Sequence, residues 1–336
     1  MKVLVTGATG FIGFHVALLL KEAGIEVRAL IRRESDIPFF NFPDMETVMG
    51  DVRDFDSVRK ALAGCSQVYH AAADYRLWVP DPESMYETNV KGTRNIMEAA
   101  LRCGVEKVVY TSTVGVMTGS RNCNPLDENS STCLEDMVGH YKRSKYLAEQ
   151  EVYGFIEKGL PAVIVNPTTP IGAMDRKPTP TGKMIVDFLN GRIPAFMDTG
   201  LNFVDVQDVA RGHLLASLKG KIGQRYILGN RNIPLRDFFS LLASLSGRRP
   251  PKIRLPYLPV LCAAYVDEAV SRWLTRRPPS IPLTGVRMAR KFMYFDSSKA
   301  VKELDFPLSP VEDALQSAVD WYERHGFVNK PGGGNR

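Results

Sequence analysis

The chain has 336 residues, of which 44% are hydrophobic and 24% are charged, as in an ordinary globular enzyme. Its net charge of +6 comes from basic and acidic residues that are interspersed, whereas nucleic-acid-binding proteins usually concentrate basic residues in one run or on one face. No apolar run is long enough to cross a bilayer. These properties argue against nucleic-acid-binding and membrane-spanning functions, and they leave room for one large α/β domain with a smaller cap.

The cysteine content favours a reducing compartment. The cysteines are odd in number and form neither a Cys-x-x-Cys pair nor a cluster with histidines: Cys65, Cys103, Cys123, Cys133 and Cys262. We therefore expect free thiols, no metal site and a cytoplasmic location. No signal peptide is expected, because the chain opens directly on its first predicted strand.

The first thirteen residues predict a nucleotide-binding turn. Lys2–Thr6 is short and β-branched, as in a buried strand, and Phe11–Ala23 has apolar residues at helical spacing. Gly7, Gly10 and Gly13 lie between or at the start of these elements. Such glycines permit a tight turn, a close approach of the backbone to phosphates, and close packing of helix against strand, while the helix N-terminus faces the negative charge. The stretch therefore predicts binding of a dinucleotide pyrophosphate.

The spacing Gly-x-x-Gly-x-x-Gly within Thr6–Gly13 resembles the extended short-chain dehydrogenase/reductase superfamily. The resemblance implies a Rossmann fold, which is a doubly wound parallel sheet, with a smaller C-terminal α+β substrate cap. It also implies that the cofactor contacts the turn through Gly7, Thr9, Gly10, Phe11, Ile12 and Gly13.

The end of the second predicted strand, Glu26–Ile31, favours NADP over NAD. An acidic residue here usually holds the ribose 2′-hydroxyl of NAD, but this chain has Arg32 and Arg33, which suit a 2′-phosphate. Two observations keep the alternatives open: Glu34 and Asp36 follow closely, so NAD remains an option, and both arginines could be solvated strand ends.

The third predicted strand, Thr47–Met49, leads to an Asp51–Val52 pair that resembles the adenine contact of the superfamily. The alternative for Asp51 is the N-cap of a predicted helix over Phe55–Leu62. After the fourth predicted strand, Gln67–His70, the small residues Ala71, Ala72 and Ala73 let the backbone approach the cofactor. His70 is expected to be structural, with proton transfer as the alternative.

A loop with aromatic and cationic residues follows. Arg76 could bind an anionic group of the substrate, and Tyr75 or Trp78 could stack on a ring; the alternative is a packed surface loop. The next predicted helix, Pro82–Cys103, resembles the central helix of the superfamily. The resemblance implies that Asn89 holds the helix and the active site in place through its amide, and Asn89 is also a candidate cofactor-binding residue.

The fifth predicted strand, Lys107–Thr111, opens into the predicted catalytic set. Tyr141 and Lys145 are four residues apart, so they share one face of a helix. A tyrosine hydroxyl serves as acid or base near neutral pH when its pKa is lowered, and Lys145 together with the nicotinamide charge would lower it. Thr113, or its neighbour Ser112, would hydrogen-bond the substrate oxygen, and the superfamily pattern favours Thr113. Thr111 and Lys145 are also expected to contact the cofactor.

The sixth predicted strand, Ala162–Val165, precedes a proline-rich turn that resembles the post-catalytic segment of the superfamily. The resemblance implies that the backbone at Pro167 and Thr168 closes over the nicotinamide carboxamide. Asn166 is a substrate candidate. Further along, Asn202 and Phe203 are predicted to face the substrate.

The predicted division of the chain follows from these motifs. Residues 1–172 with 201–230 would form the NADP-binding domain, and residues 173–200 with 231–328 the substrate cap, followed by a flexible tail over 329–336.

The apolar segment Leu255–Leu274 is predicted to be a cap helix. A hydrophobic substrate entrance and a membrane-surface helix are the alternatives, and Arg272, Arg276 and Arg277 nearby would suit a membrane surface or a phosphate.

Five segments carry a closer resemblance: 72–78, 139–145, 166–170, 177–182 and 286–290. Through them the chain resembles the dihydroflavonol-reductase-like branch, and within it most of all the hopanoid-associated sugar epimerase group. Thr113 is followed by Val114 and Gly115 where sugar dehydratases have an Asp-Glu pair, so dehydration is not expected. Many sugar epimerases have Val-Tyr-Gly after this hydroxyl, whereas this chain has Val-Gly-Val-Met over 114–117, which argues against a standard nucleotide-sugar epimerase. The resemblance therefore implies an NADP-preferring ketone reductase or a hopanoid-associated epimerase, and a nucleotide-sugar epimerase with tightly held NAD is the alternative. A non-enzymatic NADP sensor is a further alternative. The resemblance also allows a homodimer through helices 82–103 and 139–158.

Overall fold

The computed structural model describes residues 1–32, 45–117 and 124–329 of the chain. Its main layer is a seven-stranded sheet in the order β10-β6-β5-β4-β1-β2-β3, in which every neighbouring pair is parallel. The strands are β1 (Lys2–Thr6), β2 (Glu26–Ile31), β3 (Glu46–Met49), β4 (Gln67–His70), β5 (Lys107–Thr111), β6 (Ala162–Pro167) and β10 (Arg225–Leu228). The predicted doubly wound Rossmann sheet is therefore confirmed.

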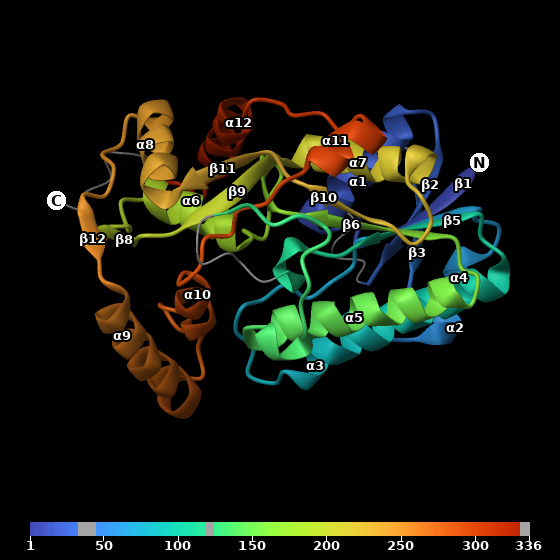
Figure 1. Ribbon diagram of the computed structural model, residues 1–336, viewed down its shortest axis with the longest axis horizontal. Helices are drawn as coiled ribbons and strands as arrows, with labels where there is room; N and C mark the ends of the chain where they lie inside the picture. Colours follow the sequence, from blue (N-terminus) through green and yellow to red (C-terminus); the bar gives the residue numbers. More distant parts are fainter. Residues whose placement is uncertain (33–44, 118–123, 330–336) are drawn as a thin grey trace.

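Helices cover both faces of this sheet, which explains why its central strands bury apolar residues on both sides. Along β1, Val3 and Val5 enter the core on one face and Leu4 enters the core on the other. One face is covered by α1 (Phe11–Glu22), α7 (Val206–Lys219) and α11 (Ser298–Leu304), and the other by α2 (Phe55–Leu62), α4 (Gly92–Cys103) and α5 (Gly139–Glu157). Figure 1 shows these two helical layers above and below the sheet.

The predicted helix over Pro82–Cys103 is continuous but not uniform. It consists of α3 (Glu83–Tyr86), a π-helical turn (Glu87–Lys91) and α4. Short 3-10 turns at Val114–Val116 and Leu134–Asp136 precede α5. The π-helical turn carries Asn89 and lies against α5, which is the helix that supplies the predicted Tyr141 and Lys145.

The cap is built around a separate hydrophobic core. Its strands form a three-stranded sheet and a two-stranded pair: β7 (Thr169–Ile171), β9 (Gly200–Asp205) and β11 (Arg231–Pro234), then β8 (Ala195–Met197) with β12 (Ile253–Leu255). Its main helices are α6 (Pro180–Leu189), α8 (Leu235–Ser246) and α12 (Val311–Arg324). Beyond β12, α9 (Tyr257–Val270), a π-helical turn (Ser271–Thr275) and α10 (Leu283–Met288) extend away from the seven-stranded sheet (Figure 1).

One segment of the predicted cap lies elsewhere. Ala300 and Leu304 of α11, and Phe306 after it, are buried in the core formed by α1, α7 and the seven-stranded sheet. Residues 298–306 thus pack on the nucleotide-binding domain, although the sequence placed all of 231–328 in the cap.

Some predictions can be examined only in part. No helix within the described ranges combines the length and apolar character needed to cross a bilayer. The cysteines at 65, 103, 133 and 262 are free thiols, whereas Cys123 and nearly all of the predicted tail lie outside the described residues.

Candidate active site

A cavity of about 480 Å³ lies between the carboxyl ends of the parallel strands and the cap, a volume typical of small-molecule sites. Residues that follow the ends of β1 to β5 form its first half: Gly7, Thr9, Gly10, Phe11, Ile12, Gly13, Arg32, Asp51, Val52, Ala71, Ala72, Ala73 and Thr111. The second half includes Tyr75, Thr113, Tyr141, Lys145, Pro167, Thr168, Leu201, Met288, Met293 and Phe295. Most of the predicted site residues therefore line one cavity.

Two positions of the glycine turn, Gly7 and Gly13, have no space for a side chain. Gly7 has φ of +72°, and a Cβ there would lie 2.6 Å from the backbone nitrogen of Ala72. A Cβ on Gly13 would lie 2.1 Å from the carbonyl oxygen of Gly7. No side chain caps α1 at Gly10, and its first turn holds no acidic residue. Uncapped backbone N–H groups at a helix N-terminus attract an anion, so the turn fits a dinucleotide pyrophosphate.

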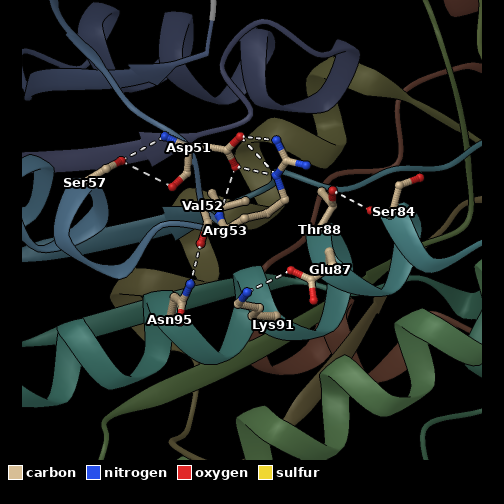
Figure 2. A network of polar contacts seen from close by, with 9 residues as sticks. All are labelled: Asp51, Val52, Arg53, Ser57, Ser84, Glu87, Thr88, Lys91 and Asn95. Atoms are coloured by element: carbon tan, nitrogen blue, oxygen red, sulfur yellow. Dashed lines mark hydrogen bonds and ion pairs between the residues drawn. The ribbon is translucent and has the colours of Figure 1, made fainter.

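The turn after β3 is fixed from two sides (Figure 2). The backbone nitrogen of Asp51 donates to Ser57 Oγ at 2.8 Å, and Asn95 Nδ2 donates to the carbonyl oxygen of Val52 at 2.9 Å. Ser57 belongs to α2 and Asn95 to α4, so both helices hold the cavity-lining pair Asp51–Val52 in place.

The Asp51 carboxylate pairs with Arg53, at 2.6 Å between Nη2 and Oδ2 (Figure 2). Hydrogen bonds from Arg53, with a smaller contribution from the charge of Arg32, lower the pKa of Asp51. The N-cap of α2 is Asp54, whose side chain accepts from the backbone nitrogen of Asp56. The alternative role of Asp51 as that N-cap is therefore wrong. Arg32 lines the cavity, and Arg33 lies outside the described residues.

His70 is structural, as expected. Its Nδ1 is hydrogen-bonded to Thr6 Oγ1 at 2.7 Å and its Nε2 to Thr93 Oγ1 at 3.1 Å. Burial lowers the pKa of this imidazole to about 3, so the ring is neutral at physiological pH. The side chain therefore ties β1 and β4 to α4 next to Ala71–Ala73.

The predicted catalytic residues come together at the junction of the two halves of the cavity. Tyr141 and Thr113 both line the cavity, and the Thr113 side chain acts to lower the pKa of the Tyr141 phenol. Thr113 Oγ1 accepts from the backbone nitrogen of Gly115 at 3.0 Å. Lys145 Nζ donates to the carbonyl oxygen of Thr111 at 2.8 Å. The end of β5 and the first turns of α5 thus bring two hydroxyls and an ammonium into one region.

The electrostatics differ from the sequence-based expectation. Burial raises the pKa of Tyr141 to about 12, whereas the sequence argument predicted a lowered value. Burial also lowers the pKa of Lys145 to about 7, and the charge of Glu149 opposes that shift. Lys145 Nζ donates to the Tyr110 hydroxyl at 2.9 Å and to the carbonyl oxygen of Thr111. The pKa of Tyr141 is therefore dominated by the burial of its own phenol. Tyr141 is therefore a neutral phenol at neutral pH, the form that can donate a proton.

Asn166 supports this group from behind the cavity wall rather than facing the cavity. Its side chain is fully buried, and its Nδ2 donates to the carbonyl oxygen of Thr113 at 3.1 Å and to Glu149 Oε2 at 3.2 Å. The Ser112 hydroxyl also donates to Glu149. Asn166 was expected to contact the substrate, but in the structure it holds the backbone of Thr113 in position.

Asn202 and Phe203 were predicted to face the substrate, and the structure corrects both. Phe203 is fully buried and stacks on Phe238, with ring centroids 4.3 Å apart. Asn202 Nδ2 donates to Asn232 Oδ1 at 2.7 Å, and its Oδ1 accepts from the backbone nitrogen of Asn230 at 2.9 Å. Both side chains hold the cap together, and neither lines the cavity.

Of the three substrate candidates in the loop after Ala73, only Tyr75 lines the cavity, and Leu77 of the same loop lines it as well. Tyr75 lines it and donates its hydroxyl to the carbonyl oxygen of Lys177 at 3.0 Å. Arg76 is exposed and pairs with Asp74, and Trp78 is half-buried away from the cavity.

Asn89 is a supporting residue and not a cavity-lining one. Its Oδ1 accepts from the backbone nitrogen of Asp74 at 2.7 Å, and its Nδ2 donates to the carbonyl oxygen of Asp74 and to Ser144 Oγ, both at 2.9 Å. The expected cofactor contact is therefore replaced by a link between the loop after Ala73 and α5.

Sequence reasoning missed Lys142, because lysines on helices are usually solvated. This side chain is 7% exposed and lines the cavity, and its Nζ contacts Met293 Sδ at 3.9 Å. It is in no ion pair within the part of the chain that the structure describes. Burial lowers the pKa of Lys142 to about 8. No pattern in the sequence marks it, since the adjacent Tyr141 and Lys145 explain the motif by themselves.

Comparisons with known proteins agree with this geometry. Residues 3–229 match the model of the NAD dependent epimerase/dehydratase family. The chain is 44% identical over 328 residues to a protein of Synechocystis sp. that carries the name dihydroflavonol 4-reductase, covering 96% of this chain and 95% of that protein. It is 33% identical to the sterol demethylase protein B of Methylococcus capsulatus, covering 98% of this chain and 100% of that protein. The crystal structure of gox2253 superposes with a TM-score of 0.87 at 45% identity, covering 98% of this chain and 99% of the other.

Proposed function

The chain belongs to the NAD dependent epimerase/dehydratase family, and from this premise we propose that it is an NADP(H)-dependent reductase of a ketone. The observation that carries the proposal is the convergence of Thr113, Tyr141 and Lys145 on the cavity that also contains the glycine turn. A nucleotide bound along the ends of β1 to β5 would meet this set at the junction with the cap.

Each residue of the set has a separate task. When bound, the nicotinamide supplies the hydride for a carbonyl carbon. Thr113 orients the carbonyl oxygen, and Tyr141 donates a proton to it. Lys145 holds the ribose hydroxyls and stabilises the phenolate that proton transfer leaves behind. Tyr141 is protonated at physiological pH, which is the state that reduction of a carbonyl requires at its start.

The NADP preference rests on Arg32. Its side chain lines the cavity directly after β2, where a carboxylate would hold the 2′-hydroxyl of NAD. A guanidinium at this position pairs with a 2′-phosphate through charge-assisted hydrogen bonds.

The walls of the second half of the cavity favour a largely apolar substrate. Leu201, Met288, Met293 and Phe295 contribute apolar surface there, and Tyr75 adds an aromatic ring. The relatives named for a dihydroflavonol reductase and a sterol demethylase protein point to ring compounds. We therefore propose a ketone or secondary alcohol on an apolar ring system as the substrate.

An epimerase is the second candidate, and the family match supports it. It would use the same three residues, with a hydride removed and returned to the opposite face of the substrate and no net consumption of nucleotide. A sensor without catalysis is the third, and the retention of both Tyr141 and Lys145 argues against it.

Transfer of deuterium from NADPH labelled at C4 to a panel of alicyclic ketones separates these candidates. A reductase produces labelled alcohol and one NADP⁺ per product. Epimerisation of a sugar without net oxidation of NADPH would replace this proposal with the second candidate, and binding without either reaction would support a sensor.

A further inference from the structure

Helix α9 presents an unusual surface. It packs inward through Tyr257, Val260, Leu261 and Ala264 against α10. Its other side and the π-helical turn that continues it carry exposed apolar residues: Leu258, Tyr265, Val266, Val270, Trp273 and Leu274. We refer to these six residues as the α9 face. Figure 1 shows α9 at the outer edge of the molecule, with α10 between it and the nucleotide-binding domain.

The α9 face is continuous. Leu258, Val266, Val270 and Trp273 are separated by steps of eight, four and three residues, which keep them on one side of a helix. Trp273 is 80% exposed and Leu274 is 77% exposed. Single exposed apolar residues are normal on a protein, but a contiguous stripe that includes a tryptophan marks a surface of interaction.

The charges beside the α9 face are positive. Arg272, Arg276 and Arg277 are exposed, and none is in an ion pair among the residues that the structure describes. The acidic residues of the helix, Asp267 and Glu268, are half-buried, and Asp267 accepts from the backbone nitrogen of Ile281 at 2.7 Å. Tryptophan with leucine on one side and arginines at the edge is the composition of helices that lie in the interface of an anionic bilayer.

We propose that the α9 face docks on the surface of a membrane that contains anionic lipids. The apolar side chains would insert at the level of the lipid headgroups, while Arg272, Arg276 and Arg277 pair with lipid phosphates. This docking is independent of the proposed reductase activity, because it needs only the surface residues of α9 and the turn after it.

Docking in this orientation would also place the substrate half of the cavity near the membrane. Helix α10 packs against α9, and its Met288 lines the second half of the cavity. An apolar substrate dissolved in the membrane would therefore reach the cavity along α10. This part of the inference rests on the proposed function.

Flotation of the purified protein with vesicles tests the docking. We expect it to float with vesicles of phosphatidylcholine and phosphatidylglycerol and to stay in solution with phosphatidylcholine alone or at high salt, since charge attraction is screened. In the double variant Trp273→Ser and Leu274→Ser, the fraction of protein that floats with the vesicles should fall at least tenfold. Leu218→Ser, a change of another exposed leucine, which lies on α7, should float as the wild type does.

Three outcomes would overturn the docking: no flotation of the wild type, equal loss in Leu218→Ser, or a dimer by light scattering that Trp273→Ser dissociates. The last would identify a second copy of the chain as the occupant. Thermal melts of the variants check that they fold. Failure of ketone reduction with intact flotation would count against the proposed function alone.

Discussion

The two halves of the cavity are built differently. The nucleotide half consists of short segments that follow consecutive strands, and its critical surface is backbone, as at Gly7 and Gly13. The substrate half brings together Tyr75, Leu201 and Met293, which are far apart in the chain and belong to irregular segments or the cap. A site made from local backbone geometry can be read in a sequence, whereas a wall made of distant side chains depends on how the whole cap packs.

The largest expected effect lies where the two halves meet. Tyr141→Phe removes the proton donor and should lower kcat by roughly a thousandfold, the usual contribution of general acid catalysis. Because the change keeps the ring, the dissociation constant for NADPH should stay within about twofold and the thermal midpoint should not fall. Steady-state kinetics and nucleotide titration check this. A variant with wild-type kcat would remove Tyr141 from the chemistry.

The next effect tests the backbone character of the nucleotide half. Gly13→Ala places a Cβ 2.1 Å from the Gly7 carbonyl oxygen, so the turn must open. Overpacking costs about 1–3 kcal/mol, and we expect a tenfold to hundredfold weaker nucleotide affinity, by the usual relation of about 1.4 kcal/mol per tenfold. Gly154→Ala in α5, where a Cβ meets no atom within 4 Å, is the matched control and should not weaken binding. Equal affinities for both variants would contradict the backbone argument.

Lys142 provides a test in the substrate half of the cavity, because it is a buried lysine without a carboxylate partner in the described chain. Its pKa falls from 10.5 to about 8 on folding, which corresponds to a cost of about 3 kcal/mol. Below pH 8 the lysine is charged in both states, so the folded protein carries the full cost. The cost declines between pH 8 and 10.5 and vanishes above, as the unfolded chain also loses the proton.

Lys142→Met should therefore raise the free energy of unfolding at pH 7 by up to about 3 kcal/mol, with the gain vanishing above pH 10.5. Denaturant unfolding across this pH range measures it. Lys60→Met, which changes an exposed lysine on α2, is the control for the substitution itself. A destabilised Lys142→Met at pH 7 would mean that the ammonium has a favourable partner.

The smallest effect concerns nucleotide choice. Arg32→Ala should weaken NADPH binding by about tenfold, as for the loss of one exposed charge-assisted contact, and should leave NADH binding unchanged. Fluorescence titration with both nucleotides checks the ratio, with Arg59→Ala on α2 as an arginine control outside the cavity. If the ratio of the dissociation constants for NADPH and NADH does not change, residues other than Arg32 must bind the 2′-phosphate.

The elements of the nucleotide-binding domain could be predicted almost residue by residue. The strands, the glycine turn and the helix that carries Tyr141 and Lys145 are encoded in local patterns of apolar residues and glycines. The confirmed structural role of His70 followed from its place at the end of a buried strand. The packing of these elements was harder to predict. No local sequence pattern indicates that α11 packs on the nucleotide-binding domain.

Side-chain direction in the cap could not be predicted. Phe203 and Asn202 lie in a strand pattern that is the same whether a residue faces a cavity or a core, and the structure buries both, Phe203 against Phe238 and Asn202 against Asn232. Asn166 and Asn89 were identified as important from their motifs, but the contacts that they make, to Thr113 and Asp74, involve backbone groups that only the folded chain brings near. The raised pKa of Tyr141 likewise depends on burial, which a motif does not report.

The most direct test is to measure the nucleotide that leaves the purified protein when it is denatured. A reductase that binds and releases NADP(H) in each turnover should carry well under one nucleotide per chain. Any retained nucleotide should be NADP(H), because Arg32 lines the cavity directly after β2, where we propose that the 2′-phosphate binds. Near-stoichiometric NAD(H) would contradict both the assigned cofactor and the reductase, and would identify an enzyme that recycles a tightly held nucleotide, as an epimerase does.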